Sequence, residues 1–178
     1  MEFSIAKACA SNLEETGVLY GAVCDSLADK PYNPGWRRDG FPTAANAKKY
    51  LETGTLLLAR ANGILAGSVA FTPNPSAEEE EDGSFPVPPP STGAVWYIHV
   101  LAVHPDFLRQ GVASQLLDAA GEQARAAGVS ALRLYVWEGN TVAIHAYEKN
   151  GYLPIQAGVD IGLAEFGLER FTLYEKAL

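Results

Sequence analysis

The stretch from Tyr97 to Leu117 constrains the fold more than any other part of the chain. It begins inside the run VWYIHVLAV, residues 95–103, which is rich in β-branched and aromatic residues and predicts a strand buried on both faces. His104-Pro105-Asp106 ends this strand, because proline cannot donate to a ladder. Residues 113–127 then place apolar side chains at steps of three and four, which predicts an amphipathic helix.

The loop between this strand and this helix is a candidate anion site. Gly111, Ala113 and Ser114 have small side chains, which allow an anion to approach the backbone closely. The first N–H groups of a helix have no partner inside it, and the helix dipole is positive there. The sequence matches neither the P-loop pattern nor G-x-G-x-x-G. On these residues alone, a phosphate site and an ordinary strand–helix connection both remain open.

Two motifs in this part of the chain resemble those of one family. Residues 108–113 resemble motif A of the GNAT superfamily of N-acetyltransferases, [QR]-x-x-G-x-[GA], which follows a strand. Leu108 stands where that pattern has Gln or Arg, but the loop acts mainly through backbone N–H groups. Residues 140–152 resemble the N-x-x-A-x-x-x-Y-E-K-x-G-[FY] helix of the same family. The resemblance covers residues 55–178 well and the first third more loosely.

The resemblance implies an α/β fold, with a single N-acetyltransferase domain over residues 1–178 and a mixed central sheet of about seven strands flanked by helices. In this family the fourth and fifth strands splay apart, and the pantetheine arm of acetyl-CoA lies between them. Residues 1–54 would form the variable acceptor side, and residues 93–152 the acetyl-CoA-binding core. Acetyl-CoA is the expected acetyl donor. The residues expected to bind it are Leu101, Ala102, Val103, Arg109, Gln110, Gly111, Val112, Ala113, Ser114, Asn140 and Tyr147.

Transfer of an acetyl group from a thioester to an amine requires a neutral amine, a stabilised oxyanion and a protonated leaving thiol. Tyr147 matches the general acid of the family. His99 is the candidate base, because the arylalkylamine N-acetyltransferases carry histidine there in a similar H-x-L-A-V-H run. A free imidazole is neutral at physiological pH. Glu138, at the end of the fifth strand, and water alone remain alternatives as the base.

Alternation along the central strand predicts that Tyr97, His99, Leu101 and Val103 share one face, which the family geometry turns toward the cleft. Asn-Gly at Asn62-Gly63, between two apolar runs, predicts a hairpin. Near the N-terminus, residues 11–14 have the pattern of a capping box that opens a helix.

The acceptor side is less well determined. By the resemblance, aromatic residues of the first third are candidates for the wall of an acceptor pocket. They are Tyr20, Tyr32, Trp36 and Phe41. Trp36 with Arg37 and Arg38 is also a candidate contact for the CoA phosphates. Residues 73–92 form an acidic and proline-rich insertion, with its carboxylates at 78–82, which predicts either a solvated loop or a lid beside the acceptor.

Composition narrows the class of protein. A chain of 178 residues suits one domain, and its net charge of −8 argues against sequence-independent nucleic-acid binding. No apolar run is long enough for a membrane helix, and no secretory signal is visible, so the expected location is cytoplasmic. The three histidines lack ligand spacing, so no metal is expected.

The sequence leaves several points of function open. A primary amine on a small molecule is the expected acceptor, with a peptide or protein amine as an alternative. An acyl-CoA-binding sensor or interaction domain without turnover is the alternative outside the enzymes. Whether the protein forms a homodimer also stays open.

Overall fold

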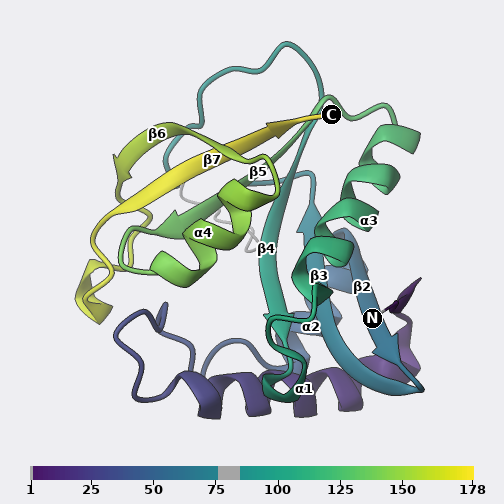
Figure 1. Cartoon of the computed structure of the whole chain (residues 1–178). Helices are drawn as coiled ribbons and strands as arrows, with labels where there is room; N and C mark the ends of the chain where they lie inside the picture. The colour runs from purple at the N-terminus through teal and green to yellow at the C-terminus, as the bar shows by residue number, and fades with distance from the viewer. Residues whose placement is uncertain (1, 76–84) are drawn as a thin grey trace.

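The computed structural model describes residues 2–75 and 85–178. These residues form one seven-stranded sheet in the order β1-β2-β3-β4-β5-β7-β6, in which only β4 and β5 are parallel neighbours (Figure 1). This mixed sheet with its flanking helices confirms the expected fold class. The strands are β1 (Ser4–Lys7), β2 (Thr55–Ala61), β3 (Ile64–Thr72), β4 (Val95–Val103), β5 (Ala131–Trp137), β6 (Leu153–Val159) and β7 (Phe171–Ala177). The helices are α1 (Leu13–Leu27), α2 (Ala44–Thr53), α3 (Val112–Ala126) and α4 (Thr141–Lys149), with short 3₁₀ helices η1 (Ala10–Asn12), η2 (Pro105–Phe107) and η3 (Ala164–Phe166).

The sheet separates two apolar cores. On one face, α3 buries Leu116, Leu117 and Ala120 at the predicted helical spacing. On the other face, α1 and α2 pack against the same strands and bury Tyr20 and Tyr50. Figure 1 shows α3 in front of β2–β4, with α1 and α2 on the opposite side. In the described part of the chain, none of the helices combines the length and apolarity needed to cross a membrane.

The β2–β3 hairpin forms as the sequence predicts. Asn62 and Gly63 have φ values of 50° and 83°, the left-handed pair that a two-residue hairpin requires. Further along β3, a Cβ at Gly67 would lie 2.8 Å from both the Ala102 carbonyl oxygen and Val112 Cγ1. The missing side chain therefore lets the first turn of α3 approach the sheet closely.

The chain enters α1 through a different cap from the one the sequence suggests. The capping box uses Cys9 and Asn12, with the Cys9 N–H donating to Asn12 Oδ1 at 2.9 Å. The expected pair of Ser11 and Glu14 is wrong, because a turn of 3₁₀ helix precedes α1 and moves the first capped residue back along the chain.

β4 and β5 diverge after a short ladder. Only residues 95–97 of β4 pair with β5, opposite residues 131–133, whereas β4 pairs with β3 as far as Val103. Among the described residues, the remainder of β4 therefore has no strand partner on the side of β5. Figure 1 shows the two strands separating, with α4 in front of the gap. The expected splay of the fourth and fifth strands is confirmed.

A β-bulge in β4 corrects one expectation about this gap. The register with β3 shifts where Ala70 faces Val100 and Phe71 faces Ile98, so His99 is the extra residue. Leu101 contacts the core on the α3 face, whereas His99 stacks on Tyr50 of α2. The prediction that His99 shares a face with Leu101 and Val103 is therefore wrong, because the extra residue reverses the alternation.

The end of the acidic and proline-rich insertion packs against the sheet. The Phe85 ring meets the Tyr135 ring edge-on, with centroids 5.3 Å apart, and Arg133 Nη1 donates to the Pro89 carbonyl at 2.6 Å. Arg133 also pairs with Glu175 of β7 at 2.7 Å. Phe85 and Pro89 are thus held against β5 by these contacts. The carboxylates at 78–82 lie outside the described residues.

Candidate functional site

The loop before α3 presents backbone N–H groups outward. Arg109 has a φ of 60° and Gly111, the N-cap of α3, a φ of 87°. The first bond of the helix runs from the Gln115 N–H to the Gly111 carbonyl at 3.1 Å. Within the described residues, nothing accepts from the N–H groups of residues 111–114, and no acidic side chain lies in the first turn. This end of α3 is thus free to bind an anion.

Four of the predicted residues belong to, or pack against, the apolar core on the α3 face of the sheet. Tyr147 of α4 is buried with Val112 of α3, and Leu101 and Val103 of β4 pack against the same cluster. The rings of Tyr147 and Tyr152 meet at 64°, with centroids 5.7 Å apart. No described residue forms a hydrogen bond with the Tyr147 hydroxyl.

The Tyr147 phenol is in the protonated form at neutral pH. Burial raises its pKa above the ordinary value of 10.0, because the phenolate would lose its hydration. A buried neutral phenol can donate a hydrogen bond to a developing anion, and that is the role of an acid.

Asn140 caps α4, as the sequence predicts. Its side-chain oxygen accepts from the Ala143 N–H at 3.2 Å, and the Asn140 carbonyl accepts from the Ile144 N–H at 3.0 Å. The cap fixes the start of the helix that carries Tyr147. It leaves the Asn140 amide NH₂ as a donor.

His99 lies on the opposite face of the sheet from Leu101. Its ring stacks on Tyr50 with centroids 5.7 Å apart and an interplanar angle of 9°. Burial lowers the pKa of His99 to about 4, so the imidazole is neutral at physiological pH. His99 Nε2 lies 2.7 Å from Oγ1 of Thr72, a residue at the end of β3 that is only 2% exposed.

The hydrogen bonds of Thr72 indicate which ring nitrogen of His99 carries the proton. Thr72 Oγ1 accepts from the Asn74 N–H at 3.3 Å and donates to the Asn74 carbonyl at 3.0 Å. Because a hydroxyl has a single proton, the proton between Thr72 and His99 belongs to Nε2. We therefore assign the Nε2–H tautomer, which leaves the lone pair on Nδ1.

The carboxylate of Glu138, the other candidate base, is already engaged. Glu138 Oε1 accepts from the Gly158 N–H at 3.0 Å and from Thr172 Oγ1 at 3.2 Å. Its other oxygen, Oε2, pairs with Arg170 at 3.1 Å. These contacts join the end of β5 to β6 and β7, which is a structural task.

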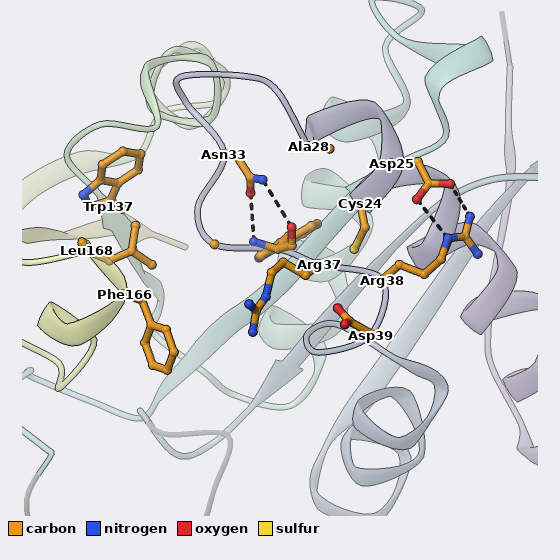
Figure 2. Close-up of a pocket in the computed structure, with 13 residues that line it drawn as sticks. Cys24, Asp25, Ala28, Asn33, Arg37, Arg38, Asp39, Trp137, Phe166 and Leu168 are labelled. Carbon is orange, nitrogen blue, oxygen red and sulfur yellow. Dashed lines mark hydrogen bonds and ion pairs between the residues drawn. The ribbon is translucent and has the colours of Figure 1, made fainter.

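A cavity of about 500 Å³ opens at the end of β5. Three segments that are far apart in the sequence line it: the end of α1 with the loop that follows, the end of β5, and the connection between β6 and β7 (Figure 2). The lining residues are Cys24, Asp25, Ala28, Asn33, Gly35, Trp36, Arg37, Arg38, Asp39, Trp137, Phe166, Gly167 and Leu168. Its size suits a small molecule.

Of the aromatic residues expected to form an acceptor pocket, Trp36 alone lines this cavity. Tyr20 is fully buried in the core beneath α1. Phe41 supports the wall from behind, with its ring edge-on to Trp36 at 6.2 Å, and Tyr32 is not among the lining residues. No pattern in the sequence points to Trp137, Phe166, Gly167 or Leu168, which line the cavity only through the pairing of β5, β6 and β7.

A glycine lets the loop after α1 approach the β6–β7 connection closely, and these two segments form two sides of the cavity. Gly35 has a φ of 82°, and a Cβ there would lie 2.9 Å from Leu168 Cδ1. Asn33 closes the same turn, since its Oδ1 accepts from the Trp36 N–H at 2.9 Å and its Nδ2 donates to the Trp36 carbonyl at 3.3 Å. These contacts fix Trp36 and the residues that follow it.

The opened sheet, the anion-binding end of α3 and the buried phenol beside them define a class of acyltransferase that receives a thioester donor between two strands. The chain belongs to the acetyltransferase (GNAT) family, whose model matches residues 22–152. It is therefore an acetyl-CoA-dependent acyltransferase.

Similar proteins agree with this assignment. A stretch of 67 residues is 40% identical to a mycothiol acetyltransferase of Propionibacterium freudenreichii subsp. shermanii, and it covers 38% of this chain but only 21% of that protein. The GNAT acetyltransferase of Streptococcus agalactiae superposes with a TM-score of 0.73 at 18% identity, over 99% of this chain and 95% of that one. The PaiA N-acetyltransferase of Thermoplasma acidophilum, solved in complex with coenzyme A, gives 0.67 at 19% identity over the whole of both chains.

Proposed function

We propose that the protein transfers the acetyl group of acetyl-CoA to a primary amine of a small molecule by direct attack, without an acyl-enzyme. The observation that carries this proposal is the opened gap between β4 and β5. A neutral imidazole, His99, lies on one face of β4 just beyond the end of the ladder, and a neutral phenol, Tyr147, lies on the other. The gap thus has a proton acceptor on one side and a proton donor on the other.

The donor is oriented by backbone groups. The pyrophosphate of acetyl-CoA binds the loop of residues 109–114, where the N–H groups of residues 111–114 are free at the positive end of α3. The pantetheine arm lies along residues 101–103 of β4, whose backbone has no strand partner on that side among the described residues. The Asn140 amide NH₂, which the cap leaves as a donor, binds the same arm.

The reaction then needs two proton transfers, one from the amine to a base and one from an acid to the leaving thiolate. The amine nitrogen attacks the thioester carbonyl, and a β4 N–H near Leu101 stabilises the oxyanion. His99 Nδ1 takes the proton that the nitrogen loses, directly or through water. The C–S bond breaks, and Tyr147 protonates the departing thiolate. Thr72 is a positioning residue, because its bond to Nε2 fixes the tautomer that makes Nδ1 the acceptor.

His99 is favoured over Glu138 as the base, because both carboxylate oxygens of Glu138 already accept hydrogen bonds or an ion pair. A small acceptor is proposed because the volume of the cavity, about 500 Å³, suits a small molecule.

Release of free thiol from acetyl-CoA, measured against a panel of amines, tests the proposal. We expect turnover of at least one small amine. Tyr147→Phe should lower kcat by about tenfold or more with unchanged acetyl-CoA binding, since it removes one general-acid contribution. His99→Ala should lower turnover of the same amine by a similar factor. Normal kcat in both variants, or turnover of peptides alone, would contradict the proposal.

A further inference from the structure

We propose that the acceptor is an amine that also carries a carboxylate, and that Arg37 binds this carboxylate. The inference rests on the proposed function, because it takes the cavity at the end of β5 as the acceptor site. It narrows the substrate class from primary amines in general to zwitterions of the α-amino acid type.

Arg37 differs from the neighbouring arginine in its contacts. Arg38 forms a two-point ion pair with Asp25, with Nε and Nη2 at 2.9 and 2.5 Å from the two carboxylate oxygens. Arg37 forms no side-chain hydrogen bond and no ion pair with any described residue. Figure 2 shows the Arg37 side chain extending into the space between Phe166 and Asp39. Its guanidinium is therefore available to donate hydrogen bonds to an anionic group of the ligand.

The backbone under Arg37 is fixed, although its side chain is exposed. The Arg37 N–H donates to the Phe41 carbonyl at 2.9 Å, and the Arg37 carbonyl accepts from the Gly40 N–H at 3.0 Å. Asn33 fixes the preceding residue, Trp36, from both sides. The guanidinium therefore projects from a closed turn, and binding a ligand requires ordering of the side chain only.

The remaining groups of the cavity favour a carboxylate attached to an amine. Beyond the Arg38–Asp25 pair, its charged groups are Arg37 and Asp39, which are not within ion-pair distance of each other. One free positive and one free negative charge suit a zwitterion better than a simple cation, which would gain from Asp39 but be repelled by Arg37. A planar guanidinium matches a carboxylate through two parallel hydrogen bonds.

The opposite wall supplies apolar surface for the rest of the ligand. Trp137 and Phe166 lie across the cavity from Arg37 together with Leu168 (Figure 2). A ligand held at its carboxylate by Arg37 can place an apolar side chain against these residues. Trp137 ends β5, the strand that diverges from β4, so this wall of the cavity belongs to one of the two strands that form the gap.

The test compares each amino acid with the amine that lacks its carboxylate, namely phenylalanine with phenethylamine, tryptophan with tryptamine, and leucine with isopentylamine. We expect the wild-type protein to give a kcat/KM about tenfold or more higher for the carboxylated member. Arg37→Gln should remove most of this preference by raising the KM of the amino acid, and should change the decarboxylated amine by less than about twofold. Arg38→Gln is the matched control, since its guanidinium is occupied by Asp25, and it should keep the preference.

Several results would overturn the inference. These are an equal or greater kcat/KM for the decarboxylated amines, a preference for O-phosphoethanolamine over all carboxylates, and a rise in the KM of acetyl-CoA alone in Arg37→Gln. The last would assign Arg37 to the CoA phosphates.

If no amine is turned over, the proposed function fails, and calorimetric titration with N-acetylphenylalanine and N-phenethylacetamide decides the inference separately. Binding that requires both the carboxylate and Arg37 supports it, and equal or absent binding of the two contradicts it.

Discussion

The proposed donor side and the proposed acceptor side of the site are built in different ways. The proposed donor side comes mainly from one continuous segment, from β4 through the loop to α3, which offers backbone N–H groups, with Asn140 and Tyr147 added from α4. The acceptor side comes from three segments, which include residues 24–39 and 166–168, and it offers side chains. The donor side therefore depends on backbone conformation. The acceptor side depends on which side chains are brought together when distant strands pair.

This difference explains why the family is easier to identify than the substrate. A backbone site needs little more than glycine at a left-handed position and small neighbours, so a short local pattern describes it. A site made of side chains can change its specificity while the backbone stays the same. The cofactor therefore follows from the fold, whereas the acceptor has to be inferred from individual residues such as Arg37.

The largest effect is expected at His99, which belongs to β4 but lies on the opposite face of the sheet from Leu101, stacked on Tyr50. Its pKa of about 4 in the folded protein lies below the ordinary 6.5, so the unfolded chain takes up the proton first as the pH falls. The contribution of the neutral imidazole to stability is complete above pH 6.5 and is lost between about pH 6.5 and 4. We expect the free energy of unfolding of the wild type, relative to His99→Gln, to fall by up to about 3 kcal/mol across this window.

Urea denaturation of both proteins at pH 7.5, 5.5 and 4.5 measures this difference. The variant is the control for the many carboxylates that titrate in the same range, because they are common to both chains. Parallel stability profiles would show that His99 is hydrated in solution. They would also contradict the lowering of the His99 pKa by burial.

The bulge at His99 also shows where sequence reasoning stops. The buried strand, the hairpin at Asn62-Gly63, the helix α3 and the Asn140 cap were all predictable, because each depends on residues adjacent along the chain. The bulge has no local signal, since the run from 95 to 103 reads as a continuous strand, and one extra residue was enough to move His99 to the other face.

The missed acceptor residues have a similar cause. Trp137 and Phe166 line the same cavity as Trp36 only after β5, β7 and β6 have paired, so no spacing in the sequence relates them. The composition around Phe85 and Pro89 predicts a low-complexity insertion. In the structure, Tyr135 and Arg133 hold these two residues against the sheet. In each case the deciding contact joins residues from distant parts of the chain.

A second prediction tests whether the donor side depends on backbone conformation. Gly111→Val places a β-branched side chain at a φ of 87°, beside the free N–H groups, and we expect acetyl-CoA to bind about tenfold more weakly or worse. Gly63→Val is the matched control, because its φ of 83° lies in the β2–β3 turn, where a Cβ would meet no atom within 4 Å. Calorimetric titration with CoA measures both. Equal weakening in the two variants would mean that loss of stability, and not loss of the anion site, explains the effect.

The smallest effect is expected on the acceptor side, at Gly35. Gly35→Ala adds a Cβ that would lie 2.9 Å from Leu168 Cδ1, so the end of that side chain must rotate and the wall of the cavity changes shape. Because Leu168 is flexible at that end, we expect a KM for the acceptor only about threefold higher, with an unchanged KM for acetyl-CoA. Gly128→Ala is the control, since its φ of 75° imposes a similar backbone strain of about 1 kcal/mol where no atom lies within 4 Å of the new Cβ.

If Gly35→Ala changed the KM of acetyl-CoA instead, the cavity would belong to the donor, and the division between the two sides would fail. If both variants lost the same stability while Gly35→Ala alone changed the acceptor KM, the effect would come from the contact with Leu168 and not from the backbone. The acceptor side would then be sensitive to a single methyl group placed against one side chain, as a site built from side chains should be.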